Sequence, residues 1–178
     1  MSQAVDITKS LPLSWSSYVA GQRVKSDDTL EIRYPWDGSL TGTLSKITSD
    51  QLEEAVQAAL GNKEMPTKNE RYEILMRARD LLAQYADEFA NLIRLEAGLC
   101  MRETRYEVGR AQEVFKFAAA EALRDDESIF SCDAAKNGPA RKIFTLREPL
   151  SLVVAITPFN HPLNQVAHKL APAIAAGV

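Results

Sequence analysis

The loop Thr157–Pro162 carries the side chains best placed in this sequence to do chemistry, an amide at Asn160 and an imidazole at His161. It follows Leu152–Ile156, an unbroken apolar run rich in β-branched residues, which is typical of a parallel strand buried on both faces. Ligands of open α/β sheets bind at the carboxyl ends of the strands. The sequence therefore predicts a binding or catalytic site in this loop.

A helix is predicted directly after the loop. Pro162 has the fixed φ that suits the first position of a helix, and Gly177 is a typical helix stop. Pro172 falls late in the helix and is expected to kink it. His168 lies within the helix and is interpreted as structural. Apolar residues recur at helical spacing on one face, namely Leu163, Val166, Ala167, Leu170, Ala173 and Ile174.

Composition bounds the class of protein. The chain has 178 residues, 46% of them hydrophobic and 25% charged, which suits one sizeable core in one or two small domains. A net charge of −3 gives no reason to expect nucleic acid or an anionic membrane as partner, and no stretch is long enough to span a membrane. Cys100 and Cys132 lack the spacing of metal ligands, so we expect no metal site and interpret both as reduced thiols of a cytoplasmic protein.

The first third of the chain predicts strands. Ser17–Val24 and Thr29–Tyr34 alternate apolar and polar residues around a Ser/Asp-rich turn, which favours a hairpin between them. Leu40–Ile47 is a weaker third strand after the turn Pro35–Gly38. Residues 1–14 are polar and mixed, and we expect them to lie over another element.

Four helices are predicted next, each from capping residues and helical apolar spacing. Their ranges are 48–61, 67–85, 87–98 and 101–124. The last of them carries its apolar stripe on Val108, Ala111, Phe115, Ala118 and Ala122. Residues 125–139 are polar and are interpreted as an exposed loop, and Arg141–Glu148 alternates again as a strand.

Four segments resemble the amino-terminal portion of the NAD(P)-dependent aldehyde dehydrogenase superfamily. They are Tyr18-Val-Ala-Gly-Gln22, Leu95-Glu-Ala-Gly98, Arg147-Glu-Pro-Leu150, and Ile156-Thr-Pro-Phe-Asn160 with the Lys169-Leu-Ala-Pro-Ala173 helix. The last is the specific one, because a strand, Pro, an aromatic residue, Asn and Pro in register before such a helix are rarely met elsewhere. The resemblance implies an α/β fold, the amino-terminal part of an aldehyde dehydrogenase with a Rossmann-like cofactor domain, helices and an oligomerisation arm.

The resemblance also implies a division of the chain. Residues 1–139 would form the amino-terminal strands and helices of the cofactor-binding domain, 140–149 the strand of the oligomerisation arm, and 150–178 the first, incomplete strand-loop-helix of the Rossmann-like unit. The family's Glu general base and Cys nucleophile, which forms the thiohemiacetal, are expected beyond Val178. The chain alone is therefore expected to be an inactive part of a longer enzyme that uses NAD or NADP and forms a homodimer or homotetramer.

By the same resemblance Asn160 is the catalytic Asn, whose amide points at the aldehyde oxygen. This oxygen gains charge when a thiolate attacks the aldehyde, and a preorganised amide donor can stabilise it by about 3 kcal/mol. The alternative is that Asn160 caps the helix or closes an Asx turn. Ile156, Thr157, Pro158 and Phe159 correspond to the segment beside the ribose and nicotinamide of the cofactor, and simple loop and core packing is their alternative role.

Two further positions predict an anionic substrate. Arg110 lies in the stretch Glu107-Val108-Gly109-Arg110, which resembles the context of a phosphate-binding Arg in the branch that oxidises glyceraldehyde 3-phosphate without phosphorylating it. His161 stands where much of the family has an aromatic residue in the aldehyde channel. An Arg fork and an imidazole that converge would bind a phosphonate or phosphate. The alternatives are an Arg110 that pairs with Glu107 or Glu113, and a His161 that caps the helix or lies on the surface.

The best candidate substrate is phosphonoacetaldehyde, because the chain resembles most the branch of the family that acts on it. Glyceraldehyde 3-phosphate, lactaldehyde and succinate semialdehyde are the alternatives within the family. Outside catalysis, the chain would be an inactive binding or assembly protein, or a stand-alone helical domain.

Overall fold

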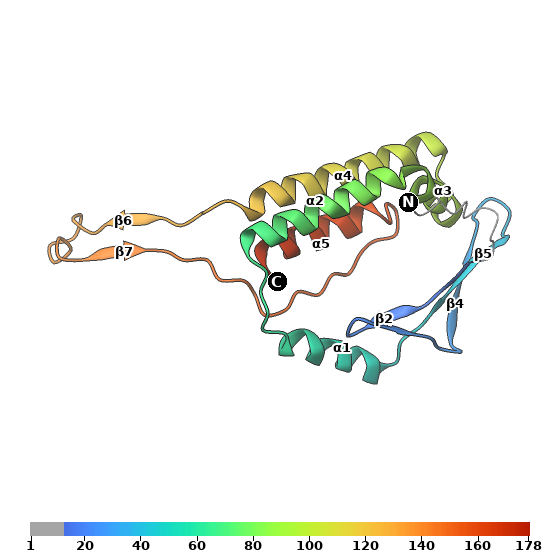
Figure 1. Cartoon of the computed structure of the whole chain (residues 1–178), viewed down its shortest axis with the longest axis horizontal. Helices are drawn as coiled ribbons and strands as arrows, with labels where there is room; N and C mark the ends of the chain where they lie inside the picture. Colours follow the sequence, from blue (N-terminus) through green and yellow to red (C-terminus); the bar gives the residue numbers. More distant parts are fainter. Residues whose placement is uncertain (1–12) are drawn as a thin grey trace.

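Helix α4 (Met101–Ala122) is the element against which the other helices of the body pack. The computed structural model describes residues 13–178. Helices α2 (Lys68–Gln84), α3 (Ala86–Ala97) and α5 (Asn164–Ala176) all contact α4, and α2 also contacts α5 (Figure 1). The predicted α/β fold class is confirmed, with helices and small sheets in one chain.

Local capping explains where the first two helices begin. Helix α1 (Ser49–Gly61) starts at a capping box, in which the Thr48 side chain accepts from the Gln51 amide and the Gln51 side chain accepts from the Thr48 amide. Thr67 and Glu70 form the same motif at α2. The four predicted helices are confirmed to within about two residues at their ends.

Small side chains let the helices of the body approach closely. The buried cluster between α2, α4 and α5 contains one large residue, Leu75, and four alanines, at positions 118, 119, 122 and 171. The distance between packed helices depends on the side chains at the contact, and alanine permits a short one. The predicted stripe of α4 is confirmed, with Val108 and Ala111 also buried and Phe115 half-buried.

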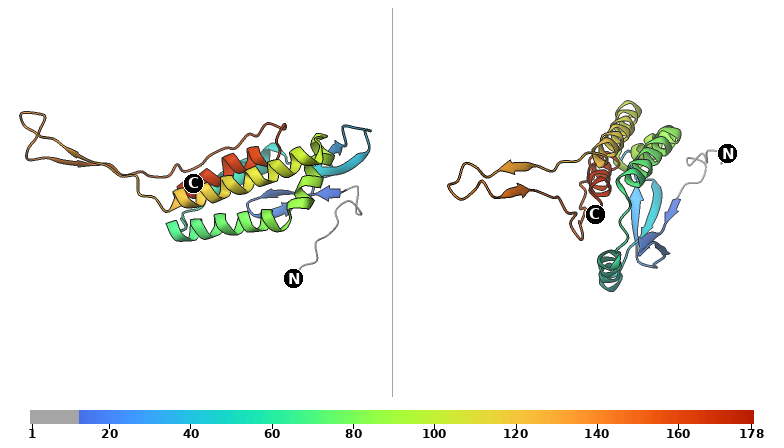
Figure 2. Two further views of the ribbon diagram at one scale, coloured as in Figure 1. Left: turned by 90° about the horizontal axis from the view of Figure 1, so that it is seen from above. Right: turned by 60° about the vertical axis from the view of Figure 1, so that its left-hand side comes forward.

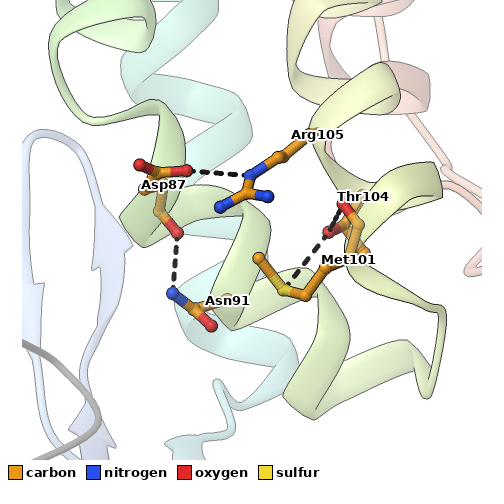
Figure 3. Close-up of polar contacts among 5 residues, drawn as sticks. All are labelled: Asp87, Asn91, Met101, Thr104 and Arg105. Atoms are coloured by element: carbon orange, nitrogen blue, oxygen red, sulfur yellow. Dashed lines mark hydrogen bonds and ion pairs between the residues drawn. The ribbon is translucent and has the colours of Figure 1, made fainter.

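Polar contacts accompany the packing of α3 on α4 (Figure 3). Arg105 Nε donates to Asp87 Oδ1 at 3.0 Å, and Asn91 Nδ2 donates to the Asp87 carbonyl at 3.0 Å. On α4 itself, Thr104 Oγ1 donates to the Met101 carbonyl at 3.2 Å. The Arg105–Asp87 ion pair is exposed and contributes less than about 1 kcal/mol. The α3–α4 contact therefore depends mainly on its buried apolar side chains.

The amino-terminal strands pair differently from the prediction. Strands β2 (Ser17–Val19) and β3 (Gln22–Val24) form their own hairpin, so the predicted pairing of 17–24 with 29–34 is wrong. The reason is a two-residue turn, in which Ala20 has φ 48° and Gly21 has φ 78°. Two positive φ values suit the tight turn of a hairpin whose strands twist normally.

A three-stranded sheet lies beside this hairpin, in the order β1-β5-β4. Strand β4 (Thr29–Arg33) runs antiparallel to β5 (Leu40–Ser45), across the predicted turn at 35–38. Strand β1 (Leu13–Trp15) runs parallel to β5 on its other side. The expectation for residues 1–14 falls almost entirely outside the described residues.

A second hairpin projects from the helical body (Figures 1 and 2). It pairs β6 (Ile129–Ser131) with β7 (Lys142–Phe144), antiparallel. Strand β7 is the centre of the strand predicted over 141–148, whereas the prediction of a loop throughout 125–139 is wrong because it contains β6. A strand of three residues is too short to show alternation.

The run Leu152–Ile156 is not a strand in the structure, although its composition predicts one. Val154 is 71% exposed and Ile156 is 82% exposed. A parallel strand exists only through hydrogen bonds to its neighbours. No segment among residues 13–178 pairs with this run, so it has no regular secondary structure.

Helix α5 ends as predicted and begins slightly later. Gly177 has φ 85° and ends the helix, and Pro172 lies within it. The first helical residue is Asn164, two positions after Pro162. The face turned to the body is centred on Ala167 and the residue four further on, Ala171, whereas the predicted Leu170 is exposed. Among the described residues, no helix is both long and apolar enough to cross a membrane.

Replacement of Leu75 by Ala tests the core. Leu75 is completely buried between α2, α4 and α5, so its truncation removes apolar contacts and leaves a cavity among alanines that are too small to fill it. We expect the free energy of unfolding, measured by urea denaturation, to fall by about 2–5 kcal/mol. Leu81→Ala, at an exposed position of the same helix, is the control. Equal effects of the two changes would contradict this account of the core.

Candidate active-site loop

The loop before α5 is attached to the helical body by a buried carboxylate, Glu107 of α4, and by the apolar packing of Leu163. Glu107 is 2% exposed. Its Oε1 accepts hydrogen bonds from the backbone amides of Leu163 at 2.9 Å and Asn164 at 3.0 Å. These are the first amides of α5, a helix whose N-cap residue offers no side-chain hydrogen bond and whose first turn contains no acidic residue. Glu107 therefore caps α5 from another helix, and its charge suits the positive end of the helix dipole.

The second oxygen of Glu107 contacts His161. The distance from Oε2 to His161 Nδ1 is 3.3 Å, and the His161 side chain is half exposed. With Glu107 ionised, its carboxylate can only accept, and we assign Nδ1 as the donor by which that edge of the imidazole is held. The other ring nitrogen, Nε2, is left for another partner. The alternative of His161 as a helix cap is not what the structure shows, because Glu107 supplies the cap.

Asn160 is exposed and lies in the bend before α5. The sequence allowed it to cap the helix, but the cap comes from Glu107 and the N-cap position is Leu163. Among the described residues, the Asn160 amide has no hydrogen-bond partner. Its side chain is thus not used to hold the local fold.

Arg110 lies one turn beyond Glu107 on α4 and is exposed. Its guanidinium lies 6.0 Å from the centre of the Tyr106 ring and donates to the Tyr106 hydroxyl at 3.5 Å. Neither ion pair that the sequence allowed is formed, because Glu107 contacts His161 and Glu113 pairs with Lys116 at 3.2 Å. The structure shows no direct contact between Arg110 and His161. Glu107 lies on the same helix as Arg110 and contacts His161.

The segment Ile156–Phe159 runs into this loop without regular secondary structure and is exposed throughout, with Phe159 at 90%. Packing of Phe159 into the core, the alternative to a binding role, does not occur among the described residues. The apolar surfaces of Ile156 and Phe159 are available to a ligand or to another part of the protein.

A second carboxylate adds to the negative charge around Glu107. Partial desolvation and the charge of Glu107 together raise the pKa of the Glu96 carboxyl above its ordinary value. The Glu96 residue as a whole is exposed, so the effect on folding stability is expected to be small. The direction of this pKa shift shows that the Glu96 and Glu107 carboxylates lie close enough for their charges to repel.

Other candidate sites are less developed. Two cavities, of about 740 and 570 Å³, lie around the α1–α2 connection, and neither contains a predicted site residue. Among residues 13–178, no cluster of three His, Cys, Asp or Glu side chains could hold a metal ion. Cys100 is exposed at the start of α4, and Cys132 is half-buried near the tip of the projecting hairpin.

The family model described as "Aldehyde dehydrogenase family" matches residues 23–178. The chain belongs to this family. The aldehyde dehydrogenases with similar sequences include 3-sulfolactaldehyde dehydrogenase of Priestia aryabhattai, which is 38% identical over 163 residues. The alignment covers 90% of this chain and 34% of that relative. Lactaldehyde dehydrogenase of Methanocaldococcus jannaschii is 33% identical, with the same coverage, 90% of this chain and 34% of the relative.

Among aldehyde dehydrogenases of known structure, the fold is similar to NADP-dependent glyceraldehyde-3-phosphate dehydrogenase of Bacillus halodurans, which was solved with NADP. The TM-score is 0.87 at 28% identity, over 93% of this chain and 36% of that one. The chain spans about a third of the length of the curated relatives it matches.

Glu107 of α4 is the residue of this site to which the sequence assigns no role of its own. The sequence indicates it only as context and as an ion-pair partner for Arg110. One signal was available, because α5 has no Ser, Thr, Asp or Asn in a capping position just before its first turn except Asn160, three residues before the observed N-cap. A helix start without a local cap indicates a cap from elsewhere.

Proposed function

We propose that the enzyme to which this chain contributes oxidises an anionic aldehyde to its carboxylate with NAD or NADP. The observation that carries the proposal is the Asn160 amide, which is exposed and is left without a structural task because Glu107 caps α5. Membership in the aldehyde dehydrogenase family supplies the class of reaction. The Cys nucleophile and Glu base would come from outside these 178 residues.

Asn160 has the chemistry that aldehyde oxidation requires. A thiolate that attacks the aldehyde carbon converts the carbonyl oxygen into an oxyanion. The side-chain N–H groups of Asn160 would donate to this oxygen, and a fixed donor stabilises the charged state more than the neutral aldehyde. The carboxylate forms when the resulting thioester is hydrolysed.

The surface of Ile156–Phe159 fits a cofactor of this kind. The segment is exposed, and Ile156 and Phe159 offer apolar faces beside the Asn160 loop, where the ribose and nicotinamide would lie. When bound, the nicotinamide accepts the hydride of the aldehyde carbon. NADP is supported by the glyceraldehyde-3-phosphate dehydrogenase neighbour, which was solved with it. NAD is the alternative.

Arg110 supports an anionic substrate. No carboxylate among the described residues pairs with its guanidinium, which rests against Tyr106. A planar fork of donors on an exposed side chain suits a phosphonate, phosphate or sulfonate. The relative that acts on 3-sulfolactaldehyde and the neighbour that acts on glyceraldehyde 3-phosphate both handle such anions, as their names state.

Phosphonoacetaldehyde is our first candidate substrate, and 3-sulfolactaldehyde and glyceraldehyde 3-phosphate share its tetrahedral anionic group. The lactaldehyde dehydrogenase relative favours a second candidate, a neutral hydroxyaldehyde, in which case Arg110 would have no anion to bind. Among residues 140–149, the projecting strand would form part of an oligomerisation arm in a homodimer or homotetramer. Residues 1–139 and 150–178 would belong to the cofactor-binding domain.

Asn160→Ala tests the catalytic role. Loss of the amide removes one oxyanion donor and leaves the cap of α5 in place, so we expect kcat in the enzyme that contains this chain to fall about 10²- to 10³-fold, with KM nearly unchanged. Asn69→Ala, an exposed amide on α2 that contacts Glu73, is the control and should leave kcat unchanged. A kcat within about threefold of the wild-type value would exclude Asn160 from the reaction.

Arg110→Ala tests the substrate class. Removal of charge-assisted hydrogen bonds should raise KM for phosphonoacetaldehyde or glyceraldehyde 3-phosphate at least about tenfold. KM for propionaldehyde, which has no anionic group, should change less than about twofold. The matched control is Arg102→Ala, which removes an exposed Arg of the same helix that pairs with Glu103. Equal changes of KM for anionic and neutral aldehydes in Arg110→Ala would contradict the proposal that Arg110 binds the substrate anion.

A further inference from the structure

We infer that Glu107 is a positioning residue that holds both functional side chains of the loop. The inference rests on the proposed function and deepens it. Each oxygen of its carboxylate has a separate task, Oε1 at the first amides of α5 and Oε2 at His161 Nδ1.

The attachment through Oε1 fixes the place of Asn160. Helices α1 and α2 begin at capping boxes made by their own residues, whereas α5 takes its cap from a residue 56 positions earlier in the chain. Asn160 lies three residues before Leu163, the first of the two capped amides. Among the described residues, no other side chain donates to or accepts from the loop 157–163. Beside the apolar packing of Leu163, this carboxylate is thus the polar contact that fixes the position of the Asn160 amide relative to α4.

The attachment through Oε2 fixes the orientation of His161. The contact holds the Nδ1 atom of the half-exposed ring at 3.3 Å from the buried Glu107 carboxylate, and Nε2 has no hydrogen-bond partner among the described residues. Arg110 lies on the same helix, one turn further on. A single residue of α4 therefore sets where the imidazole points relative to the guanidinium, which decides whether both can reach one anion.

A carboxylate that only stabilised the fold would have a different signature. It would lower the melting temperature when removed, and it would affect all substrates alike through the fraction of folded enzyme. The positioning role instead predicts a split between kcat and KM, and a split between anionic and neutral aldehydes.

Glu107→Gln separates the two tasks. The Gln carbonyl can still accept from both α5 amides, but its NH2 group faces Nδ1, so the imidazole must turn or give up its Nδ1 proton. In the enzyme that contains this chain, we expect KM for phosphonoacetaldehyde or glyceraldehyde 3-phosphate to rise about tenfold. Turnover of propionaldehyde should stay within about twofold of wild type, because Asn160 remains in place.

Glu107→Ala removes both tasks and should also lower kcat for propionaldehyde at least about tenfold, since the Asn160 amide loses its fixed position. The matched control is Glu113→Ala, at an exposed carboxylate of the same helix that pairs with Lys116, which should leave both substrates unaffected. Thermal melting of each variant reports the folded fraction.

Two results would overturn the inference. An unchanged KM for the anionic aldehyde in Glu107→Gln would contradict the claim that Glu107 orients His161. This variant tests that claim even if Glu107→Ala does not fold. An unchanged kcat in folded Glu107→Ala would remove the positioning of Asn160. A wild-type enzyme without preference for anionic aldehydes would instead refute the proposed function, while the propionaldehyde kcat of Glu107→Ala would still test the loop.

Discussion

The buried carboxylate of Glu107 is the contact on which the arrangement of this chain's candidate site depends. A carboxylate removed from water is costly unless each oxygen is paired, and a lost partner leaves an uncompensated charge. Glu107 meets this requirement with two backbone amides and one imidazole, all from the segment that begins α5. The cost of burial thus ties α4 to this segment more tightly than an exposed ion pair could. The exposed Arg105–Asp87 pair shows the contrast, because solvent screens it and α3 docks mainly through apolar contacts.

Because Glu107 caps α5, the polar side chains of the loop are not needed for capping. Asn160 would ordinarily be a good helix cap. Its release for another function is a consequence of a residue on a different helix, and the exposed segment Ile156–Phe159 leads the chain to it.

The sequence predicted most of the helices because their signals are local. The capping boxes at Thr48 and Thr67 and the glycine after α3 mark helix ends in the sequence itself. Predictions failed where the outcome depends on partners distant in the chain or on very short elements. Leu152–Ile156 has the composition of a strand but no partner among the described residues, and β6 is too short to show a period. Motif spacing indicated the family and the loop. The role of Glu107 was missed because the lack of a local cap before α5 indicates a distant cap without indicating which residue supplies it.

The most direct measurement of the central claim is hydrogen exchange, followed by mass spectrometry, in a peptide that begins before Leu163 and covers the start of α5. In the wild-type enzyme, the amides of Leu163 and Asn164 should exchange slowly, because both are bonded to a buried carboxylate. In Glu107→Ala they should exchange at least about tenfold faster, while peptides from α1, which has its own capping box, keep their wild-type rates. Equal exchange at the start of α5 in the two proteins would show that Glu107 does not hold this loop.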